Sequence, residues 1–335
     1  MSRLSSKLAK TALSLGRAVI LLVPWWLSPT PSAATQTEPF SAWMDELRRE
    51  ALSQGISSDT LDAALTDVAP IPRVLELDRK QPEFTLTFQQ YMDRVVPQGR
   101  VDIGKQKLRE NRVLLEEVSR KYGVQPKYIV AFWGIETDFG RLTGGFPVVP
   151  ALATLAYDGR RSAYFRKELI NALTILNGKH IEPAQMTGSW AGAMGQCQFM
   201  PSSFLSYAID FDGDGRKDIW SSKADVFASA ANYLARSGWK GDQTWGRPVK
   251  LPADFDRKLV GANVQKTIGE WQKLGVRRTD GGDLPSRDLM ASIVLPEEGQ
   301  KAAFLVYNNY QTILKWNRST FFAVAVGTLA ERIGG

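Results

Sequence analysis

The feature that most constrains this chain is an apolar stretch that runs from Tyr128 to Arg141. Its pattern predicts an α-helix with defined ends. Pro126 is favoured in the first turn of a helix, and Gly140 is favoured at the residue just after a helix end. We therefore expect a helix that begins near residue 126 and ends at Gly140.

One face of this helix carries a carboxyl group beside large apolar side chains. Ile129, Phe132 and Glu136 are separated by three and then four residues, so they lie on the same face. An apolar surrounding makes a carboxylate costly to ionise and raises its pKa, and a general acid needs a raised pKa near neutral pH. The alternative is a glutamate at a helix end that pairs with Arg141 or is solvated.

Residues 1–34 predict a secretory signal peptide, because basic, apolar and small residues follow one another in that order. The basic residues, with no acid among them, are Arg3, Lys7, Lys10 and Arg17. The apolar run 18–27 contains Pro24 and is too short to span a bilayer. We expect cleavage near Ala34 and a periplasmic mature protein without a membrane span. A short membrane anchor is the alternative.

The charge and the rare residues exclude several classes of function. Removing the four basic residues of the leader lowers the formal charge from +7 to +3, which argues against a nucleic-acid-binding protein. Cys197 and His180 are the single cysteine and histidine, so neither a disulfide nor a cysteine-based metal site can form within the chain. No Gly-x-Ser-x-Gly motif is present. Chemistry must rest on carboxylates, hydroxyls, amides and aromatic groups, and His180 is expected to be a surface or structural residue.

The pattern along the chain predicts a mainly α protein of the α+β class. Residues 35–125 are expected to form an N-terminal helical domain, in which 101–122 is one long helix ending at Gly123. Residues 126–244 form the expected core, 245–307 a small β-containing domain, and 308–335 a helical return to the core.

A run of small residues at 188–203 predicts a close approach of the backbone to another group. That group is either a ligand, with Gln198 and Phe199 beside it, or simply a neighbouring helix.

The segment that starts at Asp210 predicts a calcium-binding loop. Asp210, Asp212 and Asp214 stand at positions 1, 3 and 5 of the loop, with a glycine at position 6. Position 7 is Arg216, which would contribute its carbonyl oxygen. Position 12 is a serine instead of the usual glutamate, so Asp225 would supply the late carboxylate from a longer loop, 210–225. The alternative is an acidic turn held by local hydrogen bonds.

Five motifs in this order resemble one known family. They lie at residues 134–141, 191–203, 210–225, 231–233 and 313–319. Together they resemble the lytic murein transglycosylase B family, glycoside hydrolase family 103, and the resemblance covers nearly all of the chain after residue 34. It implies a lysozyme-like helical catalytic core. It also implies cleavage of the MurNAc–GlcNAc β-1,4 bond of peptidoglycan, with formation of a 1,6-anhydromuramoyl end.

The resemblance also implies roles for individual residues. The catalytic acid of the family corresponds to Glu136, and its calcium ligands correspond to the residues named above, with Asp225 after a one-residue insertion. The residues expected to contact sugar are Ser189, Gln198, Phe199, Tyr233 and Trp316. Trp316 stands where some members have tyrosine, so stacking on a sugar is expected there in place of a hydroxyl contact. For the aromatic residues, burial in the core is the alternative.

A single clear acid has a mechanistic consequence. Most glycosidases use two carboxyl groups, but Asp138 lies two residues beyond Glu136 and therefore points to another side of the helix. One acid is sufficient if a hydroxyl group of the substrate is the nucleophile. The alternatives are a muramidase that uses water, a non-catalytic glycan-binding scaffold, and a calcium sensor, which a single loop makes a weak hypothesis.

Overall fold

The structure, a computed structural model, describes residues 39–80, 86–297 and 302–335. Within these ranges the protein is mainly helical and has a small antiparallel sheet, as the sequence predicts. The predicted signal peptide lies outside the described residues. No helix in the described ranges is long and apolar enough to cross a membrane.

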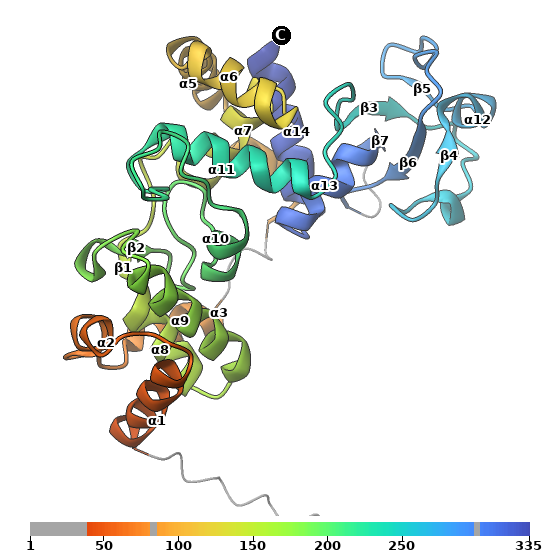
Figure 1. The fold of residues 1–335 in the computed structure, drawn as a ribbon. Helices are drawn as coiled ribbons and strands as arrows, with labels where there is room; N and C mark the ends of the chain where they lie inside the picture. The colour runs from red at the N-terminus through yellow and green to blue at the C-terminus, as the bar shows by residue number, and fades with distance from the viewer. Residues whose placement is uncertain (1–38, 81–85, 298–301) are drawn as a thin grey trace, which may run out of the picture.

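Five helices form one end of the molecule, at the bottom of Figure 1. They are α1 (Phe40–Ser53), α2 (Ser58–Leu65), α3 (Pro72–Lys80), α8 (Val148–Tyr157) and α9 (Ser162–Asn177). Helices α8 and α9 pack against each other, α2 packs on α9, and α3 packs on α8. Asp78 of α3 is buried and forms ion pairs with Arg160 and Arg161, which precede α9. Because a buried carboxylate is costly to leave unpaired, these pairs hold α3 on the α8–α9 pair.

A second group of helices contains α7 (Pro126–Thr137). Its other members are α4 (Phe88–Val95), α5 (Gln98–Glu110), α6 (Arg112–Tyr122), α10 (Pro201–Tyr207), α11 (Lys223–Arg236), α13 (Asn308–Trp316) and α14 (Thr320–Gly334). Helices α5, α6, α11 and α14 all pack on α7. Every residue of α7 from Tyr128 to Gly134 is buried, which explains why the sequence is apolar on all sides of this helix.

The end of α7 differs from the prediction. The helix stops at Thr137, and Asp138 and Phe139 adopt left-handed backbone angles (φ 51° and 61°) before Gly140. The turn brings the Phe139 ring against Gly134, where a Cβ atom would lie 2.7 Å from the ring. Aspartate tolerates this backbone region better than most residues. The helix therefore ends two residues earlier than predicted, because Gly140 was expected directly after its last residue.

The long helix predicted for residues 101–122 is also wrong. It is two helices, α5 and α6, which meet at Asn111. The Asn111 side chain donates to the carbonyl of Lys107, and its backbone leaves the helical region (ψ 17°). Such local side-chain bonds compete with helix continuation. The predicted end at Gly123 is confirmed, because Gly123 has a left-handed conformation (φ 70°).

The remaining elements include a five-stranded antiparallel sheet with the order β4-β6-β7-β3-β5. The strands of this sheet are β3 (Gly246–Lys250), β4 (Lys266–Thr267), β5 (Arg277–Arg278), β6 (Met290–Val294) and β7 (Ala303–Val306). Helix α12 (Ile268–Lys273) directly follows β4. The strands β1 (Phe146–Pro147) and β2 (Thr187–Gly188) form a separate pair. Two short 3-10 helices span Pro183–Gln185 and Arg257–Leu259. The sheet and α12 lie to the right in Figure 1 and enclose their own apolar cluster around Trp271.

One larger apolar cluster extends through the helices on both sides of residue 125. The helices before residue 125 therefore share a core with the helices after it. The domain boundaries drawn from the sequence stay a prediction.

Candidate active site and acidic loop

Glu136 lies in the last turn of α7 and is half-buried. Ile129 and Phe132, which share its helix face, are almost completely buried. Glu136 borders two spaces. One is an enclosed void of about 10 Å³ that Ile129, Phe132 and Trp316 also line. The other is an open cleft of about 510 Å³. The residue thus connects the apolar core to a surface that a ligand can reach.

The cleft brings together residues from segments that are far apart in the sequence. Its lining consists of Leu86, Tyr91, Arg94, Val95, Arg100, Ile135, Glu136, Asn317 and Phe322. Among these described residues, Glu136 is the one carboxylic acid. Tyr91, Arg94 and Arg100 come from α4 and α5, where the sequence showed no sign of a site. Asn317 belongs to the last of the five motifs, so its position could have been inferred.

Arg141 does not pair with Glu136, contrary to the simpler alternative. Its guanidinium group forms an ion pair with Asp138, to which its Nε donates at 2.8 Å, and Arg100 approaches Asp138 at 3.4 Å. Burial tends to raise the pKa of Asp138, but hydrogen bonds and charge from Arg141 and Arg100 outweigh it and lower that pKa below its usual value. Asp138 is therefore an ionised residue that fixes the turn after α7.

Glu136 has a specific partner in Trp316, the last residue of α13. The indole Nε1 of Trp316 donates a hydrogen bond to Oε1 of Glu136 at 2.7 Å. The two residues are 180 positions apart, and no spacing in the sequence indicates this contact.

The predicted aromatic residues gather around Trp316. Its ring centroid lies 5.2 Å from that of Phe199 and 4.7 Å from that of Tyr233. Tyr233 and Trp316 are half-buried, whereas Phe199 is only 2% exposed. The Phe199 ring therefore supports the other two rings, and a direct contact with sugar would require it to become exposed.

The run of small residues folds into a tight loop between β2 and α10. Cβ atoms at Gly192 and Gly195 would lie 2.4 Å from Leu152 and 2.6 Å from the carbonyl oxygen of Ile219. Both glycines also have positive φ angles, of 86° and 61°. The close approach that the sequence predicted is thus made with neighbouring parts of the protein.

Ser189 and Gln198 both bond to their own loop. Ser189 Oγ accepts from the backbone N–H groups of Ala191 and Ala193, at 3.3 and 3.1 Å. The Gln198 amide donates to the carbonyls of Thr143 and Gly195, at 3.1 and 2.9 Å. Their predicted contact with sugar stays a prediction.

Sequence reasoning missed Gln196. Its Oε1 accepts from the indole of Trp133 on α7 at 2.7 Å, and its Nε2 donates to the carbonyl of Trp220 at 2.7 Å. The backbone N–H of Gln196 also donates to Ile219 at 2.8 Å. Gln196 therefore joins the helix of Glu136 to the acidic loop.

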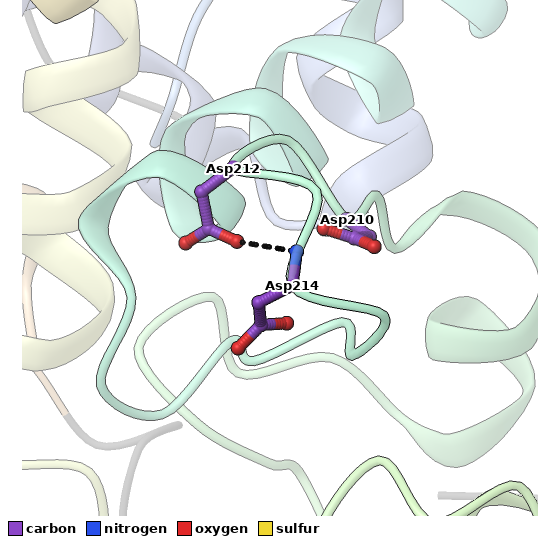
Figure 2. A group of neighbouring side chains, drawn as sticks. All are labelled: Asp210, Asp212 and Asp214. Atoms are coloured by element: carbon purple, nitrogen blue, oxygen red, sulfur yellow. Dashed lines mark hydrogen bonds between the residues drawn. The ribbon is translucent and has the colours of Figure 1, made fainter.

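The acidic loop lies between α10 and α11. Each of Asp210, Asp212 and Asp214 offers a carboxylate oxygen within 4.8 Å of the others, and Figure 2 shows the three side chains around one turn. The Asp210 carboxylate accepts from the N–H groups of Gly213 and Gly215, and Gly215 has a φ of 91°. Three carboxylates this close repel one another, so the arrangement suits a cation.

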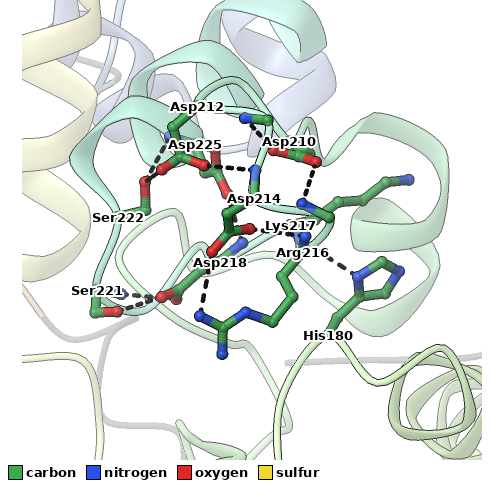
Figure 3. A network of polar contacts seen from close by, with 12 residues as sticks. His180, Asp210, Asp212, Asp214, Arg216, Lys217, Asp218, Ser221, Ser222 and Asp225 are labelled. Atoms are coloured by element: carbon green, nitrogen blue, oxygen red, sulfur yellow. Dashed lines mark hydrogen bonds and ion pairs between the residues drawn. The ribbon is translucent and has the colours of Figure 1, made fainter.

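Asp225 is completely buried beneath this loop. Its two oxygens accept from the N–H groups of Phe211 and Asp218, both at 2.7 Å (Figure 3). Burial, reinforced by the charges of Asp212 and Asp210, raises the pKa of Asp225 against the lowering effect of those hydrogen bonds. Asp225 thus ties Phe211 and Asp218 of the loop to the start of α11. Its role as a calcium ligand stays a prediction, as does that of the Arg216 carbonyl.

The single histidine and cysteine have structural contacts. Nδ1 of His180 accepts from the N–H of Lys217 at 3.3 Å, and burial lowers its pKa (Figure 3). Cys197 is buried, with Sγ 3.3 Å from the carbonyl oxygen of Val226, and burial raises the pKa of its thiol. A buried thiol that keeps its proton is a poor nucleophile.

Comparisons with known proteins agree on one family. The model of the transglycosylase SLT domain matches residues 39–331. The membrane-bound lytic murein transglycosylase B of Escherichia coli (strain K12) is 36% identical over 225 residues. The aligned part is 63% of this chain and 58% of that protein, so the chain spans less than two thirds of the curated relative it matches.

Two solved structures are similar over most of the chain. SltB3 from Pseudomonas aeruginosa, in complex with NAG-anhNAM-pentapeptide, is 44% identical with a TM-score of 0.86, covering 89% of this chain and 80% of that one. The Escherichia coli lytic transglycosylase Slt35, in complex with calcium, is 28% identical with a TM-score of 0.75, covering 88% and 93%. The predicted lysozyme-like helical fold is confirmed.

Proposed function

Because the chain belongs to the transglycosylase SLT domain family, we propose that it is a peptidoglycan lytic transglycosylase. In this proposal it cleaves the β-1,4 bond between MurNAc and GlcNAc in glycan strands and leaves a 1,6-anhydromuramoyl end. The bound NAG-anhNAM-pentapeptide in the Pseudomonas aeruginosa relative supports this choice of substrate.

The observation that carries the proposal is that Glu136 is the one carboxylic acid among the described residues that line the cleft. Glu136 borders the open cleft, whereas Asp138 is paired with Arg100 and Arg141. Hydrolytic glycosidases generally place a second carboxyl group across the bond to activate water or to attack the sugar. With one acid, the intramolecular hydroxyl of the muramoyl residue is the better nucleophile.

The reaction then needs one group that gives and takes a proton. Glu136 donates its proton to the oxygen that leaves with GlcNAc as the bond from C1 breaks. The carboxylate so formed accepts the proton of the muramoyl O6 hydroxyl as that oxygen bonds to C1. Glu136 ends the cycle protonated, and no water is consumed.

Glu136→Gln separates the enzyme from a glycan-binding scaffold. We expect the variant to fold and to bind peptidoglycan, and to lose at least the proton-transfer contribution, a factor of about 100 to 10,000 in lytic rate. Glu117→Gln on α6 is the matched control, because Glu117 is exposed and outside the cleft. Full lytic activity of the Glu136 variant would exclude Glu136 as the acid.

Product analysis separates the transglycosylase from a muramidase. Intramolecular attack leaves each muramoyl end one water lighter than hydrolysis does, and without a reducing group. Mass spectrometry of products from purified sacculi should find the anhydro form. Reducing muramic acid as the main product would contradict the transglycosylase assignment.

We further propose that Ser189, Gln198, Tyr233 and Trp316 contact the glycan, with Phe199 supporting the rings of Tyr233 and Trp316. All four are half-buried, so parts of them are accessible. Aromatic faces next to closely packed backbone suit flat sugar rings.

Calcium is the metal that we propose for the acidic loop, in a structural role. Carboxylates at positions 1, 3 and 5 and a glycine at position 6 match a calcium loop, and the three side chains converge within 4.8 Å. Arg216, through its carbonyl, and Asp225 would complete the set. The relative Slt35 was solved with calcium.

The compartment follows from the substrate and from the first 34 residues. We propose export to the periplasm with cleavage close to Ala34, since the basic, apolar and small residues follow in the order of a signal peptide. N-terminal sequencing of the exported protein should find a start near residue 35. A start at Met1 would contradict the proposal.

A further inference from the structure

Trp316 contacts Glu136 with a group that can only donate. The indole Nε1 carries one hydrogen and accepts none, and it lies 2.7 Å from Oε1 of Glu136. A tyrosine hydroxyl in the same place could donate or accept. The tryptophan of this chain therefore imposes a direction on the hydrogen bond.

The indole is held in place by three other elements. Its ring contacts Phe132 of α7 at 4.6 Å between centroids, Phe199 of the small-residue loop and Tyr233 of α11. The hydroxyl of Tyr233 donates to the carbonyl of Lys315 at 2.6 Å, and Nζ of Lys315 donates to the carbonyl of Ser237 at 2.7 Å. These bonds clamp the end of α13 to the end of α11, so the indole has little freedom to turn.

We propose that Trp316 is a positioning residue for Glu136. The indole N–H fixes one oxygen of the Glu136 carboxyl group and directs the proton of the acid to the other oxygen. This inference rests on the proposed function of Glu136 as the acid. In a neutral carboxylic acid the carbonyl oxygen accepts hydrogen bonds better than the hydroxyl oxygen does. Donation to Oε1 therefore favours the neutral acid with its proton on Oε2. The same N–H stabilises the carboxylate that forms when the proton is transferred, because hydrogen bonds to charged acceptors are stronger than neutral ones.

This role differs from stacking on sugar. A stacking residue acts through its ring, and phenylalanine supplies a smaller one, so a purely stacking role predicts that Trp316→Phe raises KM and leaves kcat nearly unchanged. A positioning residue acts through the N–H, which phenylalanine lacks. In that case kcat should fall by about 10- to 100-fold, the usual size of a hydrogen bond to a charged group, in addition to any change in KM from the smaller ring.

The pH dependence of kcat gives an independent test of the positioning role. Removing a donor to the carboxylate disfavours the charged form and raises the pKa of Glu136, so the acid keeps its proton to higher pH. The alkaline limb of kcat should then move to higher pH in Trp316→Phe. In the part of the chain that the structure describes, the titratable or charged groups around Glu136 include Tyr91, Arg94, Arg100, Asp138, Cys197, Tyr233 and Lys315. They are the same in both proteins, so the difference reports the indole.

The test compares three variants with the wild-type protein. Trp316→Phe should show the fall in kcat and the shifted limb, and Trp316→Tyr should restore part of kcat through its hydroxyl donor. Trp43→Phe, which removes an indole from α1 at the other end of the molecule, should leave both unchanged. A Trp316→Phe enzyme that is folded by circular dichroism and changes only KM would overturn the proposal.

A spectroscopic titration keeps the inference separate from the proposed function. The ¹⁵N–¹H signal of the Trp316 indole should shift as Glu136 titrates in the wild-type protein and should lose that shift in Glu136→Gln. A signal that does not respond to Glu136 would overturn the positioning role even in an active enzyme. A responsive signal in a protein that releases no anhydromuramoyl product would uphold the contact and reject the transglycosylase activity.

Discussion

Gln198 shows how one residue can serve both its own loop and a ligand. Its amide N–H groups hold the carbonyls of Thr143 and Gly195, which leaves Oε1 as the atom able to accept from a sugar hydroxyl. Gln198→Ala should lower the free energy of unfolding by about 1–3 kcal/mol and also reduce kcat/KM on glycan strands. Chemical denaturation and steady-state kinetics measure the two effects.

The matched control for this prediction is Gln106→Ala on α5. The Gln106 side chain bonds only to Glu110 among the described residues and lies on the surface, so both quantities should stay near the wild-type values. A Gln198→Ala protein with unchanged stability and unchanged turnover would remove Gln198 from the site.

For single residues, the sequence indicates which side chains could carry chemistry, but it does not indicate which other side chains they contact. Glu136 could be selected because its neighbours on the helix face are apolar. Its hydrogen bond with Trp316 could not be predicted, because it depends on how α13 returns to α7 after the β-containing segment. Gln196 was missed for the same reason: its partners Trp133 and Trp220 are set by the fold and not by spacing.

At the scale of elements, the helices and strands were predicted better than their ends. Runs of apolar residues predicted α7 and a β-containing segment within 245–307, because α7 and the strands β6 and β7 are buried on most sides. The end of α7 and the break between α5 and α6 depend on Asp138 and Asn111, whose side chains hold local turns. Such turns can be placed only when the partners of these side chains are known.

At the scale of the whole molecule, the acidic loop connects parts that lie far apart in the sequence. Lys217 of the loop donates to His180, which follows α9, and the indole of Trp220 donates to the carbonyl of Thr187 in β2 at 3.0 Å. Gln196 joins the loop to Trp133 of α7. A cation in the loop should therefore stabilise more than the loop itself.

The prediction is that calcium raises the melting temperature of the whole protein. Asp210, Asp212 and Asp214 repel one another without a cation, so the folded state should bind calcium better than the unfolded chain does. At a free calcium concentration 100 times the dissociation constant, binding adds about 2.7 kcal/mol to the free energy of unfolding. Thermal melts with calcium and with a chelator should differ accordingly.

Two variants make this measurement specific to the loop. Asp212→Asn keeps an oxygen acceptor for the bond from Ser222 but removes one charge, so the difference between the calcium and chelator melts should shrink. Asp254→Asn removes an exposed charge outside the loop and should keep the full difference. Because Gln196 connects the loop to α7, calcium should also slow hydrogen exchange of the α7 amides. Identical melts in both buffers, with no calcium found by elemental analysis, would show that the loop is an acidic turn held by its own hydrogen bonds.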